Sequence, residues 1–192
     1  MSDLRSFLRP LYQDLDGASR FEEIERVAAI ARRLYAPATD ADERSFERLL
    51  LFHGLGRWLE KVGNLSRAAL TTGLSEGELR TTAASIRRLE DPSSDAERAV
   101  AAAVLIDGAG VRGLAERLSR SRREGSSVLD VVRNALADAV EPAWLPENAR
   151  AWLARRWEAR RRVCDAVLSE LRLADAPTAS GSPAAPRPRE DG

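Results

Sequence analysis

Apolar residues recur along most of the chain at intervals of three and four, the spacing that gathers them on one side of a helix. The clearest stripe spans residues 20–36 and ends before Pro37, and it consists of Phe21, Ile24, Val27, Ala28, Ala31 and Leu34. Comparable stripes predict helices at 2–14, 40–62, 64–72, 99–106, 127–140 and 146–173, with another after Ser75 and an Arg-rich one ending at Arg123. No stretch shows the alternation of a strand. The pattern predicts an all-α protein.

The longest apolar run is Leu49–Leu59, within the helix expected at 40–62. A helix that is apolar nearly all round is a buried helix. The run contains His53, the only histidine of the chain, so His53 is predicted to lie inside the protein. We expect Asp40, with Glu43 three residues on, to cap the start of this helix.

Two further helix starts have the Ser-x-x-Glu pattern of a capping box, at Ser75–Glu78 and Ser94–Glu97. Asp107-Gly108-Ala109-Gly110 interrupts the next helical pattern with two glycines. The glycine spacing differs from that of a phosphate loop, so Gly108, Gly110 and Gly113 are interpreted as close-packing positions at a helix bend.

The composition changes at residue 174, where Ala, Pro, Ser and Gly replace the apolar stripes. Such a segment buries too little apolar surface to offset the entropy of ordering it, so 174–192 is predicted to be a disordered tail. Residues 1–173 form a single predicted domain, and 44% apolar residues over 192 positions suffice for one core.

Acidic and basic residues balance at 30 each, so no overall charge attracts the chain to nucleic acid or membrane. A single cysteine, Cys164, excludes an internal disulfide and a Cys-based zinc site. No apolar run approaches the length of a membrane span and no export signal opens the chain, which favours a cytoplasmic protein.

Four stretches resemble one family in the same order. Asp16–Val27 ends in Ile-x-Arg-Val, Leu50–Gly56 reads Leu-Leu-Phe-His-Gly-Leu-Gly, Asp107–Leu114 is a glycine-punctuated turn, and 148–171 resembles a closing helix. Together they resemble the HD superfamily of metal-dependent phosphohydrolases, in its small bacterial single-domain branch. The resemblance covers about residues 2–173 and implies an HD-like helical bundle.

The family's metal ligands are largely replaced in this chain. The resemblance places Glu23 at the first His, His53 at the second His, Gly54 at its partner Asp, and Val104 at the last Asp. A catalytic divalent site needs about three well-placed ligands. If Gly54 and Val104 stand where carboxylates once bound metal, we expect their surroundings to have become more apolar.

The leading hypothesis is therefore a degenerate HD-domain protein without a metal cofactor. It would bind a nucleotide-like ligand, a partner protein or a second copy of itself as a homodimer. The alternative is an active phosphohydrolase whose rebuilt site consists of Glu23, His53 and Asp107, a ligand set that suits Mn, Fe or Mg.

A third hypothesis is a helical nucleic-acid-binding module that uses two basic clusters. One cluster lies at 117–123, with Arg117, Arg120, Arg122 and Arg123, and the other at 155–162, with Arg155, Arg156, Arg160, Arg161 and Arg162. Acidic residues are interleaved with both, as on an ordinary solvated helix face. Nucleic acid is accordingly not the expected partner.

Overall fold

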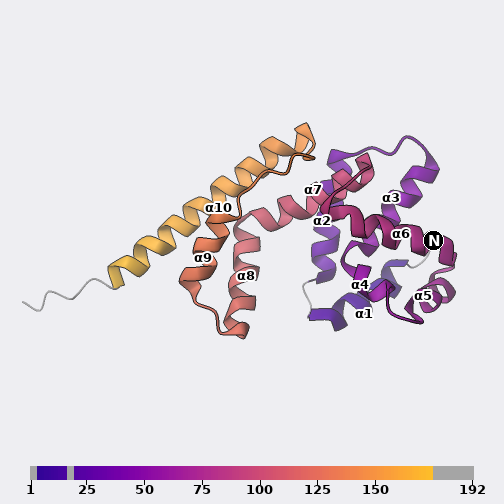
Figure 1. Ribbon diagram of the computed structural model, residues 1–192, viewed down its shortest axis with the longest axis horizontal. Helices are drawn as coiled ribbons and strands as arrows, with labels where there is room; N and C mark the ends of the chain where they lie inside the picture. Colours follow the sequence, from indigo (N-terminus) through magenta and orange to yellow (C-terminus); the bar gives the residue numbers. More distant parts are fainter. Residues whose placement is uncertain (1–3, 17–19, 175–192) are drawn as a thin grey trace, which may run out of the picture.

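Helices are the only regular elements in the described residues, 4–16 and 20–174 of a computed structural model (Figure 1). This confirms the all-α prediction. None of the helices in these ranges has the length and apolar character needed to cross a membrane. The predicted tail falls almost wholly outside the described residues, and Ala174 belongs to the last helix.

The elements follow one another with short connections. They are α1 (Leu4–Asp16), α2 (Arg20–Leu34), α3 (Asp40–Phe52), η1 (His53–Leu55), α4 (Gly56–Leu59), α5 (Asn64–Thr72), α6 (Glu76–Arg87), η2 (Arg88–Glu90), α7 (Asp95–Ala109), α8 (Val111–Glu124), α9 (Val128–Ala137) and α10 (Glu147–Ala174). The helix predicted at 99–106 is longer at both ends than expected.

Helix α7 joins the two ends of the molecule. Figure 1 shows α1–α6 gathered at one end and α8–α10 at the other, with α7 running between them. Its most extensive contacts are with α2, followed by α10. Seven apolar residues of α7 are buried, namely Ala99, Val100, Ala101, Ala102, Ala103, Ile106 and Ala109. The two ends therefore share one buried helix and form a single domain.

The prediction of one continuous helix over 40–62 is wrong. Helix α3 ends at Phe52, a single 3-10 turn covers His53–Leu55, and α4 is a separate short helix. Gly54 and Gly56 fall at this break, and glycine is an unfavourable residue inside a helix. Packing supports the break, because a Cβ on Gly54 would lie 2.9 Å from Cε1 of Tyr12.

Helix starts were predicted correctly at two of three positions. Ser75–Glu78 and Ser94–Glu97 both form complete capping boxes. The cap of α3 is Thr39 instead of Asp40, since the Thr39 hydroxyl accepts a hydrogen bond from the backbone of Asp42. Aspartate and threonine are both good caps, so the sequence left two adjacent candidates.

The bend between α7 and α8 is tighter than the sequence implied. Helix α7 continues through Asp107 and Gly108, and the chain turns at Gly110. A Cβ on Gly113 would lie 2.0 Å from the carbonyl oxygen of Gly108, so at this point α8 meets the backbone of α7 with no space for a side chain. The close-packing prediction is thus confirmed for Gly113, whereas Gly108 has open space where its Cβ would be.

Candidate functional site

His53 lies at the break between α3 and α4, half-buried. Its Nδ1 is 2.7 Å from the carbonyl oxygen of Leu50, which makes Nδ1 the protonated nitrogen. Burial lowers the pKa of His53, against the opposing effects of the Leu50 carbonyl and the charge of Asp107. The ring is therefore neutral near pH 7, and Nε2 is left as its acceptor.

Asp107 is bound by an arginine. Arg26 of α2 donates from Nε to Oδ1 and from Nη2 to Oδ2, both at 3.0 Å. The side chains are 26% and 11% exposed, so water reaches Asp107 little. Burial acts to lower the pKa of Arg26, but the hydrogen bonds and charge of Asp107 outweigh it and the pKa is raised. Glu116 of α8 adds a second carboxylate 3.7 Å from Arg26 Nη2.

The rebuilt metal site is not assembled in the structure. Glu23 lies half-buried on α2, close enough for its charge to act on Arg26. Within residues 4–16 and 20–174, no group of three or more His, Cys, Asp or Glu side chains is placed to hold a metal ion. Both carboxylate oxygens of Asp107 are directed at Arg26, so a cation already occupies the position a metal would need.

Both positions expected in an apolar interior are exposed, so that expectation is wrong for Gly54 and Val104 alike, but the space around them differs. Gly54 is crowded, because Tyr12 Cε1, Tyr12 Oη and Ile24 Cδ1 lie 2.9, 3.3 and 3.6 Å from where its Cβ would be. The Tyr12 ring is buried and its hydroxyl donates to the Leu51 carbonyl at 2.8 Å. Val104 is 38% exposed on α7, so the expectation that position 104 lies in an apolar interior is wrong.

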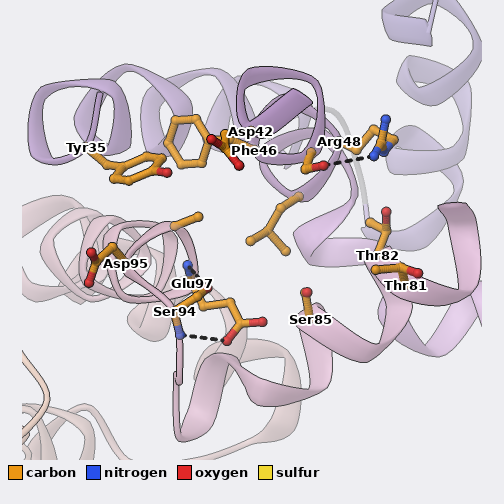
Figure 2. A pocket seen from close by; sticks show the side chains of 13 residues that line it. Tyr35, Asp42, Phe46, Arg48, Thr81, Thr82, Ser85, Ser94, Asp95 and Glu97 are labelled. Atoms are coloured by element: carbon orange, nitrogen blue, oxygen red, sulfur yellow. Dashed lines mark hydrogen bonds between the residues drawn. The ribbon is translucent and has the colours of Figure 1, made fainter. Parts of the chain in front are cut away.

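A cavity lies between α3, α6 and the start of α7. Its volume is about 320 Å³. Figure 2 shows Thr81, Thr82 and Ser85 on the α6 wall, and the hydroxyls of Thr81 and Thr82 donate to the carbonyls of Gly77 and Glu78 in the same helix. Sequence reasoning missed this cavity because its walls come from segments separated by tens of residues. The only signal was the hydroxyl-rich stretch of α6.

Arg48 forms the polar end of the cavity. Its Nη1 lies 3.1 Å from Glu78 Oε1, and its Nη2 donates to Ser45 Oγ at 3.1 Å (Figure 2). The side chain is 14% exposed, and Nε is buried with no hydrogen-bond partner among the described residues. A buried donor without an acceptor is costly, and Nε is closed to solvent, so a ligand in the cavity would reach it only if the Arg48 side chain moved.

Glu97 holds the opposite wall. It accepts from Arg88 Nε at 3.0 Å and from the backbone of Ser93 and Ser94, and its side chain is 3% exposed. Burial opposes ionisation, but these donors lower the pKa of Glu97 to about 2. The carboxylate is therefore ionised, and its hydrogen bonds to Arg88, Ser93 and Ser94 hold this wall in place. It is not free to bind a ligand.

Aromatic rings form the third side. Tyr35 and Phe46 meet edge to face, with ring centroids 5.0 Å apart. Tyr35 and Asp95 also line a second, more open hollow of about 550 Å³ on the side of Trp144. The cavity thus combines an aromatic end, a hydroxyl wall and one arginine.

The basic clusters do not form continuous faces. Arg117 pairs with Asp138, and Arg162 pairs with Glu158 at 3.1 Å. Arg160 is buried, at 3% exposure, and its Nη2 has no partner in the described part of the chain. Burial and the charge of Arg117 lower the pKa of Arg160. The second cluster is therefore split between solvent and core.

Cys164 and three tryptophans contribute to the packing of the C-terminal half. Cys164 is fully buried beside Leu114 and Val132, as a small apolar residue. Trp144, Trp152 and Trp157 pack against the core shared by α7 and α10.

Comparison with known proteins identifies no relative: no family model, no curated protein and no solved structure matches this chain.

Proposed function

We propose that this chain is a helical protein on an HD-like scaffold that has lost metal-dependent hydrolysis and acts by binding a small polar ligand. The observation that carries the proposal is the paired hydrogen bond from Arg26 to Asp107. A metal ion at Asp107 would have to displace a bound cation from a carboxylate that is only 11% exposed. The contact at Gly54 supports the same view, since the Cβ of a second carboxylate residue there would lie 2.9 Å from Tyr12 Cε1.

The cavity of Figure 2 is the binding site in this proposal. Its one arginine is already paired with Glu78, while Asp42, Asp95 and Glu97 also line the cavity. That balance disfavours a polyphosphate. Hydroxyl groups, an aromatic end and the Arg48 guanidinium suit an uncharged molecule with hydroxyl and carbonyl groups, of the size of a nucleoside.

Two measurements test the proposal. The first is melting temperature and p-nitrophenyl phosphate hydrolysis with and without millimolar Mn²⁺ or Mg²⁺. We expect that the metals raise neither the melting temperature nor the rate of hydrolysis. Metal-dependent hydrolysis that disappears in His53→Ala would instead establish the rebuilt Glu23/His53/Asp107 site.

The second measurement is a thermal-shift screen of uncharged nucleosides, followed by calorimetric titration of those that stabilise the protein. We expect binding by the wild type and a loss of about tenfold or more in Arg48→Met, because the guanidinium donor is removed. Arg44→Met, an exposed position on the same helix, is the matched control. Equal affinities for wild type and Arg48→Met would place the ligand elsewhere.

A further inference from the structure

Helices α5 and α6 are joined by a short turn that has a glycine cap at one end and a capping box at the other. Helix α5 has 9 residues and ends at Gly73, whose φ of +71° is the left-handed conformation that glycine adopts most easily. The Gly73 backbone N–H donates to the Ala69 carbonyl at 3.0 Å. Three residues later, the capping box at Ser75 starts the 12-residue helix α6. Two short helices joined by a three-residue turn that contains glycine have the connection typical of a helix-turn-helix.

The interior of this unit is a single apolar cluster. Ala68 of α5 and Leu79 of α6 are fully buried, and Leu74 in the turn packs against them. The preceding segment contributes Leu55 and Leu59, which belong to the same cluster. Helices α4, α5 and α6 each contact the other two. The result is the small three-helix core that holds the second helix of such a motif in a fixed position.

The outer side of α6 is polar, small and basic. Gly77, Arg80, Thr81 and Arg87 are exposed. The side chains of Arg80 and Arg87 are 71% and 64% exposed, and each is paired with a glutamate that is itself exposed. Such pairs contribute little stability, so both guanidinium groups can turn to other anions at small cost.

The charge of this segment is locally positive. Residues 56–88 contain six basic residues, Arg57, Lys61, Arg67, Arg80, Arg87 and Arg88, against three acidic ones, Glu60, Glu76 and Glu78. The segment therefore has a formal charge of +3 within a chain whose net charge is zero, and the ion pair of Arg88 with Glu97 reduces the local excess to +2. The zero net charge argues against strong general affinity for nucleic acid. Binding through one motif needs only a local excess of positive charge on that motif.

We propose that α5, the turn at Gly73 and α6 form a DNA-binding helix-turn-helix, with the exposed side of α6 in the major groove of double-stranded DNA. Arg80 and Thr81 lie in the first half of α6, the part that reaches base edges in this motif. Arg67 and Lys61 on the preceding elements, and Arg87 at the end of α6, are placed for phosphates. The proposal goes beyond ligand binding in the cavity and does not depend on it.

The test uses the full chain and a library of random 20-base-pair DNA duplexes. Selection at low salt, followed by fluorescence anisotropy on the recovered duplexes, should give an enriched sequence and a binding constant for it. We expect Arg80→Ala to weaken binding roughly tenfold to hundredfold and to relax the preference at one position. Arg87→Ala should weaken binding to all duplexes and reduce the salt slope by about one.

Two exposed arginines at the other end of the molecule provide controls. Arg120→Ala on α8 and Arg133→Ala on α9 should leave DNA binding unchanged. All four variants change exposed side chains, and unchanged melting temperatures will show that they fold. The proposal is overturned if no sequence is enriched and no duplex binds below about 100 μM, the weak end of non-specific affinity. Binding lost in Arg120→Ala but retained in Arg80→Ala, or stronger binding to RNA, would equally overturn it.

Discussion

Arg26 and Asp107 are 81 residues apart in the sequence and make two parallel hydrogen bonds, both 3.0 Å long. The pair fastens α2 to the end of α7, and the nearby Glu116 extends the contact to α8. Planar two-point pairing of this kind is specific to arginine, since a lysine offers only a point charge. Asp107 is one of the three residues of the alternative Glu23/His53/Asp107 metal site, and both its carboxylate oxygens accept hydrogen bonds from Arg26.

Removing Arg26 should leave the Asp107 carboxylate without a charged partner at a position that water reaches little. We expect Arg26→Met to lower the free energy of unfolding by about 2–3 kcal/mol, below the value for a fully buried pair because Arg26 is 26% exposed. Urea denaturation at pH 7 measures this. Arg112→Met, which removes an exposed pair with Glu116, should change stability by less than about 0.5 kcal/mol. Equal effects of the two variants would show that the Arg26 pair has no special role.

Two substitutions that restore carboxylates should differ sharply. Val104→Asp places its charge at a position that is 38% exposed, so we expect a change within about 1 kcal/mol. Gly54→Asp would bring a Cβ within 2.9 Å of Tyr12, and overpacking of this kind costs about 1–3 kcal/mol even though position 54 is exposed. Melting temperatures of both variants, with and without Mn²⁺, test this order. If Val104→Asp proves the more damaging, the helix face assigned to Val104 is wrong.

The sequence predicted the helices well, because each element has its own apolar stripe and its own start signal. It failed where the outcome depends on a distant partner. Nothing near His53 indicates that Tyr12 of α1 fills the space beside Gly54. Likewise, the local sequence around Asp107 does not identify Arg26 as its partner, although both residues lie in stretches that the resemblance singles out. Val104 was misplaced for a related reason: α7 is apolar almost all round, so the sequence alone does not show which side faces solvent.

Glu97 should make the free energy of unfolding depend on pH in the acidic range. Its pKa is lowered to about 2 in the folded protein from an ordinary value of 4.5. A lowered folded pKa stabilises the protein above the unfolded pKa, and this contribution is lost as the pH falls from about 5 to about 2. The shift corresponds to about 3 kcal/mol at most, reduced by the solvent exposure of Arg88. Urea denaturation of wild type and Glu97→Gln should show that the difference between their free energies of unfolding is smaller at pH 3 than at pH 7. A difference independent of pH would mean that the charge of Glu97 contributes nothing.

Arg160 should be a site where removing charge stabilises the fold. It is buried at 3% exposure and Nη2 lacks an acceptor among the described residues, while the charge of Arg117 further lowers its pKa. Replacing poorly paired buried charge by an apolar side chain of similar length is often stabilising by about 1–4 kcal/mol. We expect Arg160→Met to raise the melting temperature and the exposed neighbour Arg161→Met to leave it unchanged. A marked fall for Arg160→Met would show that the guanidinium has a partner, such as bound water or an anion.

At the bend between α7 and α8, replacing two nearby glycines by alanine should have opposite effects on stability. A Cβ on Gly113 would lie 2.0 Å from the Gly108 carbonyl oxygen, and backbone cannot swing aside as a side chain can. We expect Gly113→Ala to cost at least about 3 kcal/mol. Gly108 lies inside α7 with open space around its Cβ position, so Gly108→Ala should stabilise by up to about 1 kcal/mol through helix propensity.

The same pair of variants tests whether the bend positions the charged contact. Forcing α8 away from α7 would also move Glu116 from its place 3.7 Å from Arg26. Adding Glu116→Gln to Gly113→Ala should therefore cost less than adding it to the wild type, since the contact is already lost. A double-mutant cycle by urea denaturation measures the coupling. Strict additivity would mean that the α7–α8 bend and the Arg26 cluster are stabilised independently, and that Gly113 is required for packing alone.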